Sequence, residues 1–226
     1  MCDSEDRDGD RSPSRVREVY DEIAAHFSKT RAYPWPEVEA FLDETSVEAP
    51  KSTGLDTGCG NGRHTELLAD VVERPVGADV SRDLLFEASA KMAEDGWKAQ
   101  LVQGDAASLP FESGTVDVAL YVATLHHLPD RETRVESLSE LCRVLGDGGR
   151  ALVSAWSTVH DRFDADPDAS VGFDTTIDWT LPGGETVPRF YHIYAPAEFE
   201  ADLRESGLSI EEVYVSSGNC YAEVGV

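Results

Sequence analysis

The sequence predicts an α/β fold in which a mostly parallel sheet carries helices on both faces. From Thr53 to Trp156, short apolar runs alternate with helical stretches, which is the pattern of strands joined by crossover helices. The chain also has 226 residues, which is enough for one complete core and few for two. We therefore expect a single domain over residues 15–226.

The N-terminal part begins as a polar tail and continues as a helix. Residues 1–14 have little apolar content, so we expect a disordered acidic tail there. The next segment, SRVREVYDEIAAHFSKT, places Val16, Val19, Ile23 and Phe27 at helical spacing. This spacing predicts an amphipathic helix.

The central part supplies the alternating elements. We expect strands near residues 53–57, 75–79, 99–103, 115–121 and 150–156. The helices between them are expected near residues 62–72, 82–95 and 131–145. The glycines of LGDGGRALVSAW predict a stop after the last of these helices, before the next strand begins.

Residues 157–195 interrupt this pattern. They are rich in Asp, Pro, Gly and aromatic residues and have no helical period, so we interpret them as a substrate-side insert that is either functional or disordered. Within the insert, RFYHIY alternates like a strand, and one of its faces is expected to serve only packing. A helix from Pro196 to Gly207 and two closing strands, SIEEVYV and CYAEVGV, complete the chain.

The charge balance is strongly acidic. The chain has 44 Asp and Glu against 19 Lys and Arg, a net charge of −25, and the acids are spread along its whole length. Such a surface stays hydrated and self-repelling, as in halophilic proteins. It repels nucleic acid at low salt, but in molar salt charges interact only within about 3 Å, so acidity does not exclude an RNA partner.

Apolar runs and cysteines bound the cellular setting. No apolar run approaches the roughly 18 residues of a membrane span and no signal peptide is found, so we expect a soluble, cytoplasmic protein. Cys2, Cys59, Cys142 and Cys220 lie far apart without a CxxC pair. We expect reduced thiols and no metal site.

A glycine-rich segment, LDTGCGNGRHTELL, follows the first strand. Gly58, Gly60 and Gly62 recur at every second position, which fits neither the dinucleotide nor the Walker pattern of phosphate binding. Asp56 would also repel a phosphate, so a ligand with positive charge, such as an ammonium or a sulfonium, is indicated. Asp79 ends the second strand, where its carboxylate can accept hydrogen bonds from ribose hydroxyls.

A third carboxylate, Asp105, follows the third strand, where it and the Ala106 amide would bind an adenine edge. The three acids follow successive strands at their carboxyl ends, where open parallel sheets bind ligands beside the topological switch point. Taken singly, a glycine-rich turn is more often structural and such an Asp is more often a helix cap. Their order and spacing together indicate a cationic nucleoside.

Five segments together resemble a class I S-adenosylmethionine-dependent methyltransferase over residues 53–156: LDTGCGNGRHT, GADVS, GDAASLPF, VDVALYVATLHHLPD and ELCRVLGDGGRALVSAW. The resemblance implies a Rossmann-like, seven-stranded sheet whose last strand is antiparallel, with S-adenosylmethionine along the strand ends. The first acid and the glycines would hold the methionine end, the second acid the ribose and the third the adenine. The implied cofactor-binding residues are Asp56, Gly58, Gly60, Gly62, Asp79, Val80, Asp105, Ala106 and Tyr121.

Four further segments, YDEIAAHFSKTRAYPWP, TLHHL, RFYHIY and GNCYAEV, narrow the resemblance. They resemble the tRNA methyltransferases that esterify 5-carboxymethyluridine at the wobble position as heterodimers with a small zinc-ribbon activator subunit. Arg31, Trp35 and Pro36 stand where that family has its Arg and Pro-Trp-Pro, and Arg189, Tyr191 and His192 support the likeness. Cys220 departs from it, because the family has an aromatic residue there.

The implied chemistry needs alignment more than a base, since a carboxylate is already ionised near neutral pH. A bidentate arginine is the natural clamp for it, and Arg31 and Arg189 are the candidates. The other candidates on the substrate side are His126, His127, Trp156, Tyr191 and Asn219. One of the histidines would orient the substrate or donate a hydrogen bond to it, Trp156 would stack on the base, and Asn219 would hold the uracil edge or a substrate loop. For the histidines and Trp156, a purely structural role is an equal alternative.

Two other functions stay open at this point. GDAASLPF and LHHLPD are also typical of methyltransferases that act on small molecules such as quinone precursors. The acidic surface would suit a silent S-adenosylmethionine-binding scaffold that holds a partner. RNA binding would depend on a few local arginines or on basic surface from the activator, because phosphate contacts need Lys and Arg, and the chain has only four lysines, Lys29, Lys51, Lys91 and Lys98.

Overall fold

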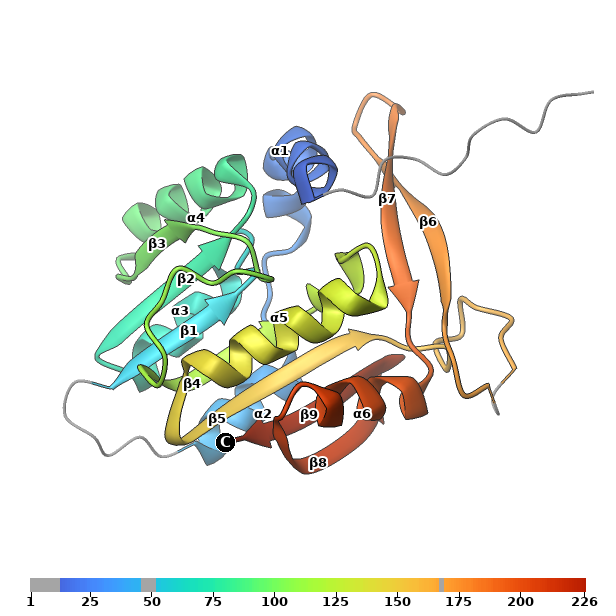
Figure 1. Ribbon diagram of the computed structural model, residues 1–226. Helices are drawn as coiled ribbons and strands as arrows, with labels where there is room; N and C mark the ends of the chain where they lie inside the picture. The colour runs from blue at the N-terminus through green and yellow to red at the C-terminus, as the bar shows by residue number, and fades with distance from the viewer. Residues whose placement is uncertain (1–12, 46–51, 167–168) are drawn as a thin grey trace, which may run out of the picture.

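The computed structural model describes residues 13–45, 52–166 and 169–226. Its centre is a seven-stranded sheet with the order β3-β2-β1-β4-β5-β9-β8 (Figure 1). The strands are β1 (Thr53–Thr57), β2 (Arg74–Asp79), β3 (Gln100–Gln103), β4 (Val116–Val122), β5 (Leu145–Trp156), β8 (Ser209–Ser216) and β9 (Asn219–Gly225). Strands β1 to β5 are parallel, and β9 is antiparallel to both of its neighbours. The predicted sheet is confirmed, including its antiparallel last strand.

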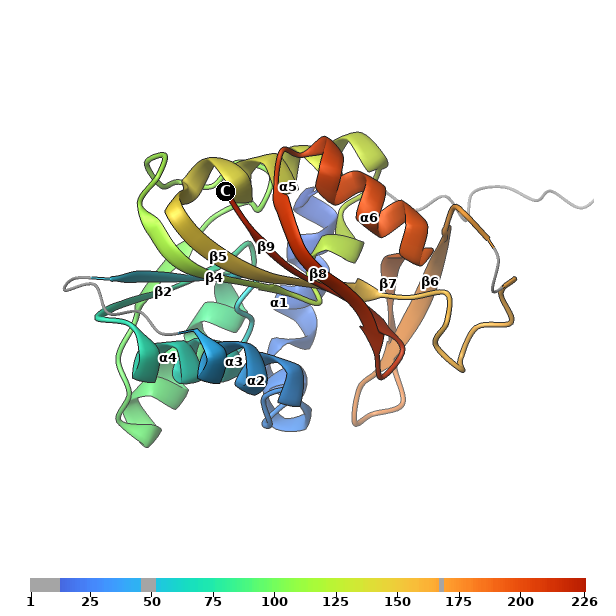
Figure 2. The same cartoon turned by 90° about the horizontal axis from the view of Figure 1, so that it is seen from below.

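Helices cover both faces of this sheet. They are α1 (Pro13–Thr30), α2 (Pro36–Glu44), α3 (Arg63–Val71), α4 (Arg82–Asp95), α5 (Arg131–Val144) and α6 (Pro196–Glu205), with a short 3-10 turn, η1 (Leu125–His127). Figure 2 shows α2, α3 and α4 on one side of the sheet and α5 and α6 on the other. In the described parts of the chain, no helix is both long and apolar enough to cross a membrane.

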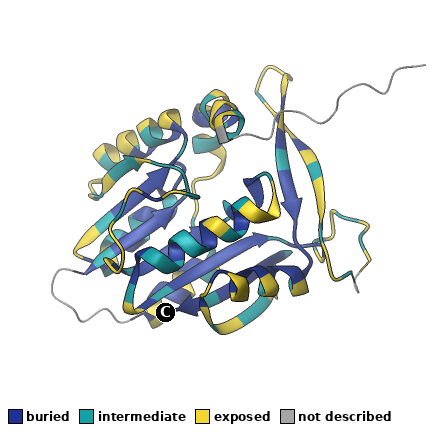
Figure 3. Cartoon of the chain, viewed as in Figure 1, coloured by how far each residue is buried: buried dark blue, intermediate teal, exposed yellow. Residues whose placement is uncertain are grey.

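Two apolar clusters, one on each face, form the core (Figure 3). On one face, Leu138 and Leu141 of α5 pack with Phe199 of α6 against β4 and β5. On the other face, Phe41 of α2 and Leu68 of α3 pack against the same strands. Strands β4 and β5 are therefore buried on both faces over most of their length, as expected for central parallel strands.

The insert contains a β-hairpin. Strands β6 (Phe173–Thr180) and β7 (Thr186–Ile193) form a separate two-stranded antiparallel sheet. The insert, which was expected to be either functional or disordered, is therefore an ordered hairpin over residues 173–193, and the strand-like reading of RFYHIY is confirmed. In Figure 1 the hairpin stands beyond the carboxyl ends of the central strands, and α1 lies between it and α4.

A third apolar cluster fastens α1 to the hairpin. Val19 and Ile23 of α1 pack against Trp179 of β6 and Val187 of β7. These contacts use the apolar face predicted for this helix. The acidic tail, predicted for residues 1–14, lies outside the described residues up to residue 12, and α1 already begins at Pro13.

The glycines after α5 do not act as a helix stop. Strand β5 begins at Leu145, earlier than the predicted residue 150, and runs through them. Its register against β4 shifts between Val116 and Val118. A Cβ at Gly149 would lie 2.9 Å from the carbonyl oxygens of both Gly146 and Val116, so glycine permits a tight irregularity inside the strand.

Candidate active site

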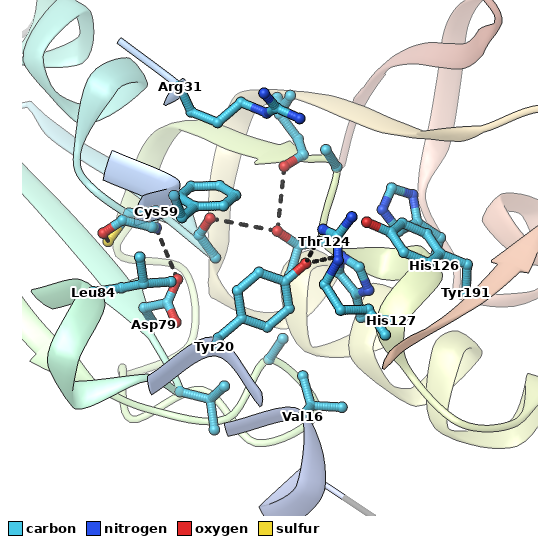
Figure 4. Close-up of a pocket in the computed structure, with 18 of the residues that line it drawn as sticks. Val16, Tyr20, Arg31, Cys59, Asp79, Leu84, Thr124, His126, His127 and Tyr191 are labelled. Atoms are coloured by element: carbon cyan, nitrogen blue, oxygen red, sulfur yellow. Dashed lines mark hydrogen bonds between the residues drawn. The ribbon is translucent and has the colours of Figure 1, made fainter. Parts of the chain in front are cut away.

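A cavity of about 570 Å³ opens at the carboxyl ends of β1, β2 and β4. The glycine loop after β1 and the turn after β4 form its floor, α1 covers it, and the β6–β7 hairpin forms its far wall. Figure 4 shows Tyr20 of α1 between Asp79 on one side and His127 and Tyr191 on the other. The cavity thus has a half beside the parallel strands and a half beside the hairpin.

The glycine loop packs closely against the turn after β4 because Gly58 has no side chain. Gly58 has φ of 73°, and a Cβ there would lie 2.0 Å from Oγ1 of Thr124. The amides of Gly58 and Cys59 both donate to the carbonyl of Ala78, at 2.7 and 3.0 Å. Gly60 follows with φ of 55° and lines the cavity. Backbone alone therefore faces this part of the cavity.

Asp79 is a buried carboxylate in the half of the cavity beside the parallel strands. Its side chain is 7% exposed, and its two oxygens accept hydrogen bonds from the amides of Gly60 and Ser81, both at 2.8 Å. Burial raises the pKa of this carboxyl to about 6, against the lowering effect of those amides. Each oxygen keeps a second lone pair, so the carboxylate can accept two further hydrogen bonds from vicinal hydroxyls.

The neighbouring end of the cavity suits a flat heterocycle. Asp105 and Ala106 line it, and Oδ1 of Asp105 accepts a hydrogen bond from the amide of Ala107 at 2.9 Å. The apolar side chains around them are Val80, Leu84 and Leu109. A carboxylate oxygen and a backbone amide beside an apolar slot fit the edge and the faces of an adenine. This half therefore fits a nucleoside.

Four predicted residues lie outside the lining of the cavity. Asp56 is buried under the glycine loop, where its Oδ2 accepts a hydrogen bond from Thr65 Oγ1 at 2.6 Å and burial raises its pKa to about 7. Gly62 precedes α3 with φ of 80°, and a Cβ there would lie 2.9 Å from the ring of Trp97. Both support the loop from behind.

The other two residues outside the lining are Tyr121 and Asn219. Tyr121 is a core residue whose hydroxyl lies 2.6 Å from the hydroxyl of Ser137 on α5. Asn219 is the residue of β9 paired with Trp156, and its amide donates to the carbonyl of Ser217 at 3.2 Å. Neither residue lines the cavity.

The hairpin half contains a buried arginine that has no anionic partner among the residues the structure describes. Arg189 of β7 is 8% exposed, and its Cζ lies 4.8 Å from the ring centre of Trp179 and 5.1 Å from that of Tyr191. Its Nη1 donates to the hydroxyl of Tyr20 at 3.4 Å, whereas its Nε is buried without a hydrogen-bond partner. None of the ion pairs among the described residues includes it.

Arg31 reaches the same aromatic ring from the end of α1. Its Cζ lies 5.1 Å from the ring centre of Trp179, so this ring joins the two predicted clamp residues. Arg31 is exposed, and its Nη1 donates a hydrogen bond to the carbonyl of Thr30 at 3.2 Å. The structure thus brings the two arginines together at the cavity but buries only Arg189.

Both predicted histidines line the cavity, and both are held by hydrogen bonds. Nδ1 of His127 lies 3.0 Å from the carbonyl oxygen of Phe190, which can only accept, so this nitrogen carries the proton. Nε2 of His127 therefore accepts from the hydroxyl of Tyr20, at 2.7 Å. Nδ1 of His126 accepts from the amide of Trp156 at 3.0 Å. Each residue thus combines a structural bond with a place in the lining.

Burial keeps the two imidazoles neutral. It lowers the pKa of His127 to about 3 and that of His126 well below its usual value. Beside them, the rings of Trp156 and Tyr191 are stacked, with centres 5.0 Å apart and planes at 21°. This half of the cavity therefore offers flat aromatic surface, neutral imidazoles and one buried cation.

Among the lining residues that sequence reasoning missed are Tyr20, Thr124 and Trp179. Tyr20 is the first residue of the segment YDEIAAHFSKTRAYPWP that carries the resemblance, but the helical period itself gives no reason to single it out. Trp179 bonds to His26 across 153 positions of sequence, with its Nε1 donating to the histidine Nδ1 at 3.0 Å. An alternation of apolar residues in FDTTIDWT was the one signal that would have indicated β6.

Comparison with known proteins agrees with this geometry. A family model described as a methyltransferase domain matches residues 55–149. The tRNA (carboxymethyluridine(34)-5-O)-methyltransferase of Saccharomyces cerevisiae is 33% identical over 174 residues, covering 77% of this chain and 59% of the yeast protein. The protein of the same name in Xenopus tropicalis is 35% identical, covering 69% of this chain and 25% of its own length. The chain thus spans only part of these two relatives.

Two further similarities extend over nearly the whole chain. A methyltransferase of Encephalitozoon cuniculi is 35% identical over 197 residues, covering 86% of this chain and 87% of that protein. Among solved structures, the complex between the Haloferax volcanii methyltransferase activator Trm112 and a methyltransferase aligns with a TM-score of 0.68 and 19% identity, covering 93% of this chain and 96% of the matched one. The latter likeness is one of fold.

Proposed function

The chain belongs to the class I S-adenosylmethionine-dependent methyltransferases, and from that membership we propose that it esterifies the carboxylate of 5-carboxymethyluridine at the wobble position of tRNA. The observation that carries the proposal is Arg189. A guanidinium buried among aromatic rings is costly unless an anion completes it. Its Nε has no hydrogen-bond acceptor among the described residues, and a planar substrate carboxylate can supply one.

The cofactor fits the half of the cavity beside the parallel strands. The backbone of Gly58 and Gly60 would lie against the methionine part, because a Cβ at Gly58 would collide with Thr124. Asp79 would accept hydrogen bonds from the ribose hydroxyls, and Asp105 and Ala106 would hold the adenine edge. When bound, S-adenosylmethionine supplies an electrophilic methyl group on a sulfonium.

The residues of the hairpin half would then align the nucleophile. A carboxylic acid with a pKa near 4 is ionised at neutral pH, so no base has to remove a proton before methyl transfer. This agrees with the neutral state of His126 and His127. Arg189 orients the carboxylate, and the stacked rings of Trp156 and Tyr191 offer a surface for the uracil.

A small zinc-ribbon activator would complete the enzyme in the cytoplasm. The chain has few basic residues, so part of the surface that binds RNA phosphates would come from this subunit. Strand β3 is an outer strand of the described sheet, and α4, which contacts it, exposes Phe86. A strand from the activator would pair with β3 and cover the apolar surface beside it.

Methyl transfer to bulk tRNA tests the proposal. The acceptor is tRNA from a strain that lacks the gene, incubated at high salt with the purified chain and labelled S-adenosylmethionine, with and without the activator. We expect incorporation that depends on the activator. No incorporation with the activator present, together with transfer to a small quinone precursor, would overturn the tRNA assignment and favour a small-molecule methyltransferase.

A further inference from the structure

The geometry points to Tyr20 of α1 as a positioning residue that orients the Arg189 guanidinium and so lets the enzyme distinguish a carboxylate from its neutral amide analogue. This inference rests on the proposed function, because it concerns the same substrate carboxylate. It assigns a specificity role to a helix that lies outside the matched methyltransferase domain at residues 55–149.

A chain of hydrogen bonds with fixed polarity leads from the hairpin backbone through His127 to Tyr20 and back to Arg189. Figure 4 shows the bond between Tyr20 and His127. The carbonyl of Phe190 can only accept, so His127 donates to it through Nδ1 and accepts through Nε2. The Tyr20 hydroxyl therefore donates its hydrogen bond to Nε2 of His127, at 2.7 Å. Its oxygen lone pairs are left to accept from Nη1 of Arg189, at 3.4 Å.

The bond to Tyr20 decides which edge of the guanidinium is left for a ligand. With Nη1 directed at Tyr20, the edge formed by Nε and Nη2 remains, and Nε has no partner among the described residues. Two parallel N–H groups on one edge match the two oxygens of a carboxylate. An amide presents N–H donors where this edge requires a second acceptor, so it leaves a donor facing a donor.

The rings around Arg189 fix the plane of the guanidinium but not its rotation within that plane. Trp179 and Tyr191 contact it through their faces, with ring centres 4.8 and 5.1 Å from Cζ. Stacking of this kind leaves the in-plane orientation open. The hydroxyl of Tyr20 supplies the missing constraint, because it is a directional acceptor at one end of the guanidinium.

Helix α1 presents Tyr20 from a firmly docked position. Asp21 accepts hydrogen bonds from the Ser81 hydroxyl at 2.7 Å and the Asp83 amide at 3.1 Å, at the start of α4. One helical turn later, His26 accepts from Trp179 at 3.0 Å. The helix thus bridges the two halves of the cavity, and Tyr20 is held on a rigid element between them.

Replacement of Tyr20 by Phe removes the hydroxyl and keeps the ring packing, which includes edge contacts with Phe27 and His127. The test measures KM and kcat on an anticodon stem-loop RNA with 5-carboxymethyluridine, and inhibition by the same RNA with 5-carbamoylmethyluridine. The wild-type chain, with its activator, is expected to prefer the carboxylate. In Tyr20→Phe we expect this preference to fall about tenfold, the loss of one hydrogen bond to a charged group, through a higher KM.

Calorimetry with S-adenosylhomocysteine accompanies the kinetics and is expected to give the same affinity for both proteins, because the Asp79 half is untouched. Tyr214→Phe, a matched change in the stacked Tyr214–Tyr221 pair of β8 and β9, serves as control and should behave as wild type. An unchanged preference in a folded Tyr20→Phe protein would overturn the positioning role alone. A wild-type enzyme that binds both RNAs equally would overturn the carboxylate site itself and this inference with it.

Discussion

At the scale of single residues, Arg189 shows how this chain uses charge. The chain has 44 acidic residues, and Arg131, Arg143, Arg150 and Arg204 all form ion pairs with them. Arg189 forms none among the described residues although it is buried. A buried charge without a counter-ion is unfavourable because of its desolvation, and such an arrangement is typical of a ligand-binding site.

The Arg189→Lys variant should keep the positive charge and lose the pair of parallel N–H donors of the guanidinium. An ammonium cannot make two parallel hydrogen bonds to a carboxylate, so we expect KM for the carboxylate RNA to rise about 10- to 100-fold, equivalent to about 1.5–3 kcal/mol. Affinity for S-adenosylhomocysteine should not change. Arg150→Lys is the matched control, because Arg150 of β5 pairs with Glu211 and Glu223 away from the cavity. Equal effects of the two variants would contradict the assignment.

Cofactor binding should depend on pH through Asp79. Burial raises the pKa of its carboxyl to about 6 in the protein without ligand, whereas hydroxyl donors from a ribose favour the ionised form and lower that pKa in the complex. Affinity for S-adenosylhomocysteine is therefore full above about pH 6 and falls as the pH drops through 6, by up to about tenfold per pH unit. Calorimetry at pH 7.5, 6.5 and 5.5 measures this.

Asp79→Asn is the control for the pH dependence. The variant keeps the size of the side chain and cannot ionise, so its weaker affinity should vary much less between pH 7.5 and 5.5. His126 and His127 stay neutral over that range and do not contribute. Asp56, whose pKa burial raises to about 7, remains in the variant. The same slope in wild type and variant would therefore assign the titration to Asp56 instead.

Site residues that lie at the ends of predicted strands could be predicted from the sequence. Asp79 and Gly58 follow strands, and the turn that contains His126 follows β4, so order along the chain indicates that they meet at one edge of the sheet. Tyr20 and Trp179 reach the same cavity from segments far away in sequence, and no local pattern contains that information. Asp56 was close in sequence to the cavity, but its side chain points into the support of the loop.

At the scale of elements, one face of β7 lines the cavity and the other packs against α6. Arg189 and Tyr191 line the cavity, whereas His192 faces α6. Nδ1 of His192 lies 2.8 Å from Asp174 of β6, and its Nε2 lies 3.1 Å from Glu198 of α6. These two contacts, one on each side of the His192 ring, hold the hairpin on α6. The prediction that one face of RFYHIY serves packing is thus confirmed.

Glu198→Gln should loosen the hairpin. Glu198 also accepts a hydrogen bond from the amide of Gly172 at 2.6 Å, so the neutral amide loses the charge and leaves one contact unmatched. We expect the free energy of unfolding to fall by about 3 kcal/mol and hydrogen exchange in β6 and β7 to accelerate. Glu200→Gln is the matched control on the same helix, since its exposed pair with Arg204 contributes only about 0–1 kcal/mol. Equal losses would contradict the anchoring role.

The elements that sequence reasoning placed well are those with a strong period. The β1 to β4 strands and the α3 to α5 helices lie within two residues of their expected bounds, because each buries a regular set of side chains. The start of β5 was missed, since its glycines serve a tight irregularity against β4 rather than a helix stop. Strand β6 was missed because Thr175 interrupts its alternating apolar positions, and because long-range contacts bury Trp179 against α1 and Ile177 against β7.

At the scale of the whole molecule, the net charge of −25 should make stability depend on salt. Self-repulsion among the acids acts over about 10 Å at 0.1 M salt and over about 3 Å at 1 M. We expect Tm to rise by about 4–8 °C between 0.1 and 1 M KCl, which corresponds to about 2 kcal/mol for a chain of this size. NaCl of equal ionic strength should act alike. A Tm that stays constant in both salts would contradict a surface adapted to high salt.

The nature of the transferred methyl group tests the central claim, that Arg189 directs a carboxylate to the methyl donor. RNA with 5-carboxymethyluridine is incubated with the chain, the proposed activator subunit and methyl-labelled S-adenosylmethionine, and the product is treated with mild alkali. A methyl ester releases its label as methanol, and RNA with the amide analogue gains no label; we predict both. Label that survives alkali, or that enters the amide RNA equally, would contradict the account.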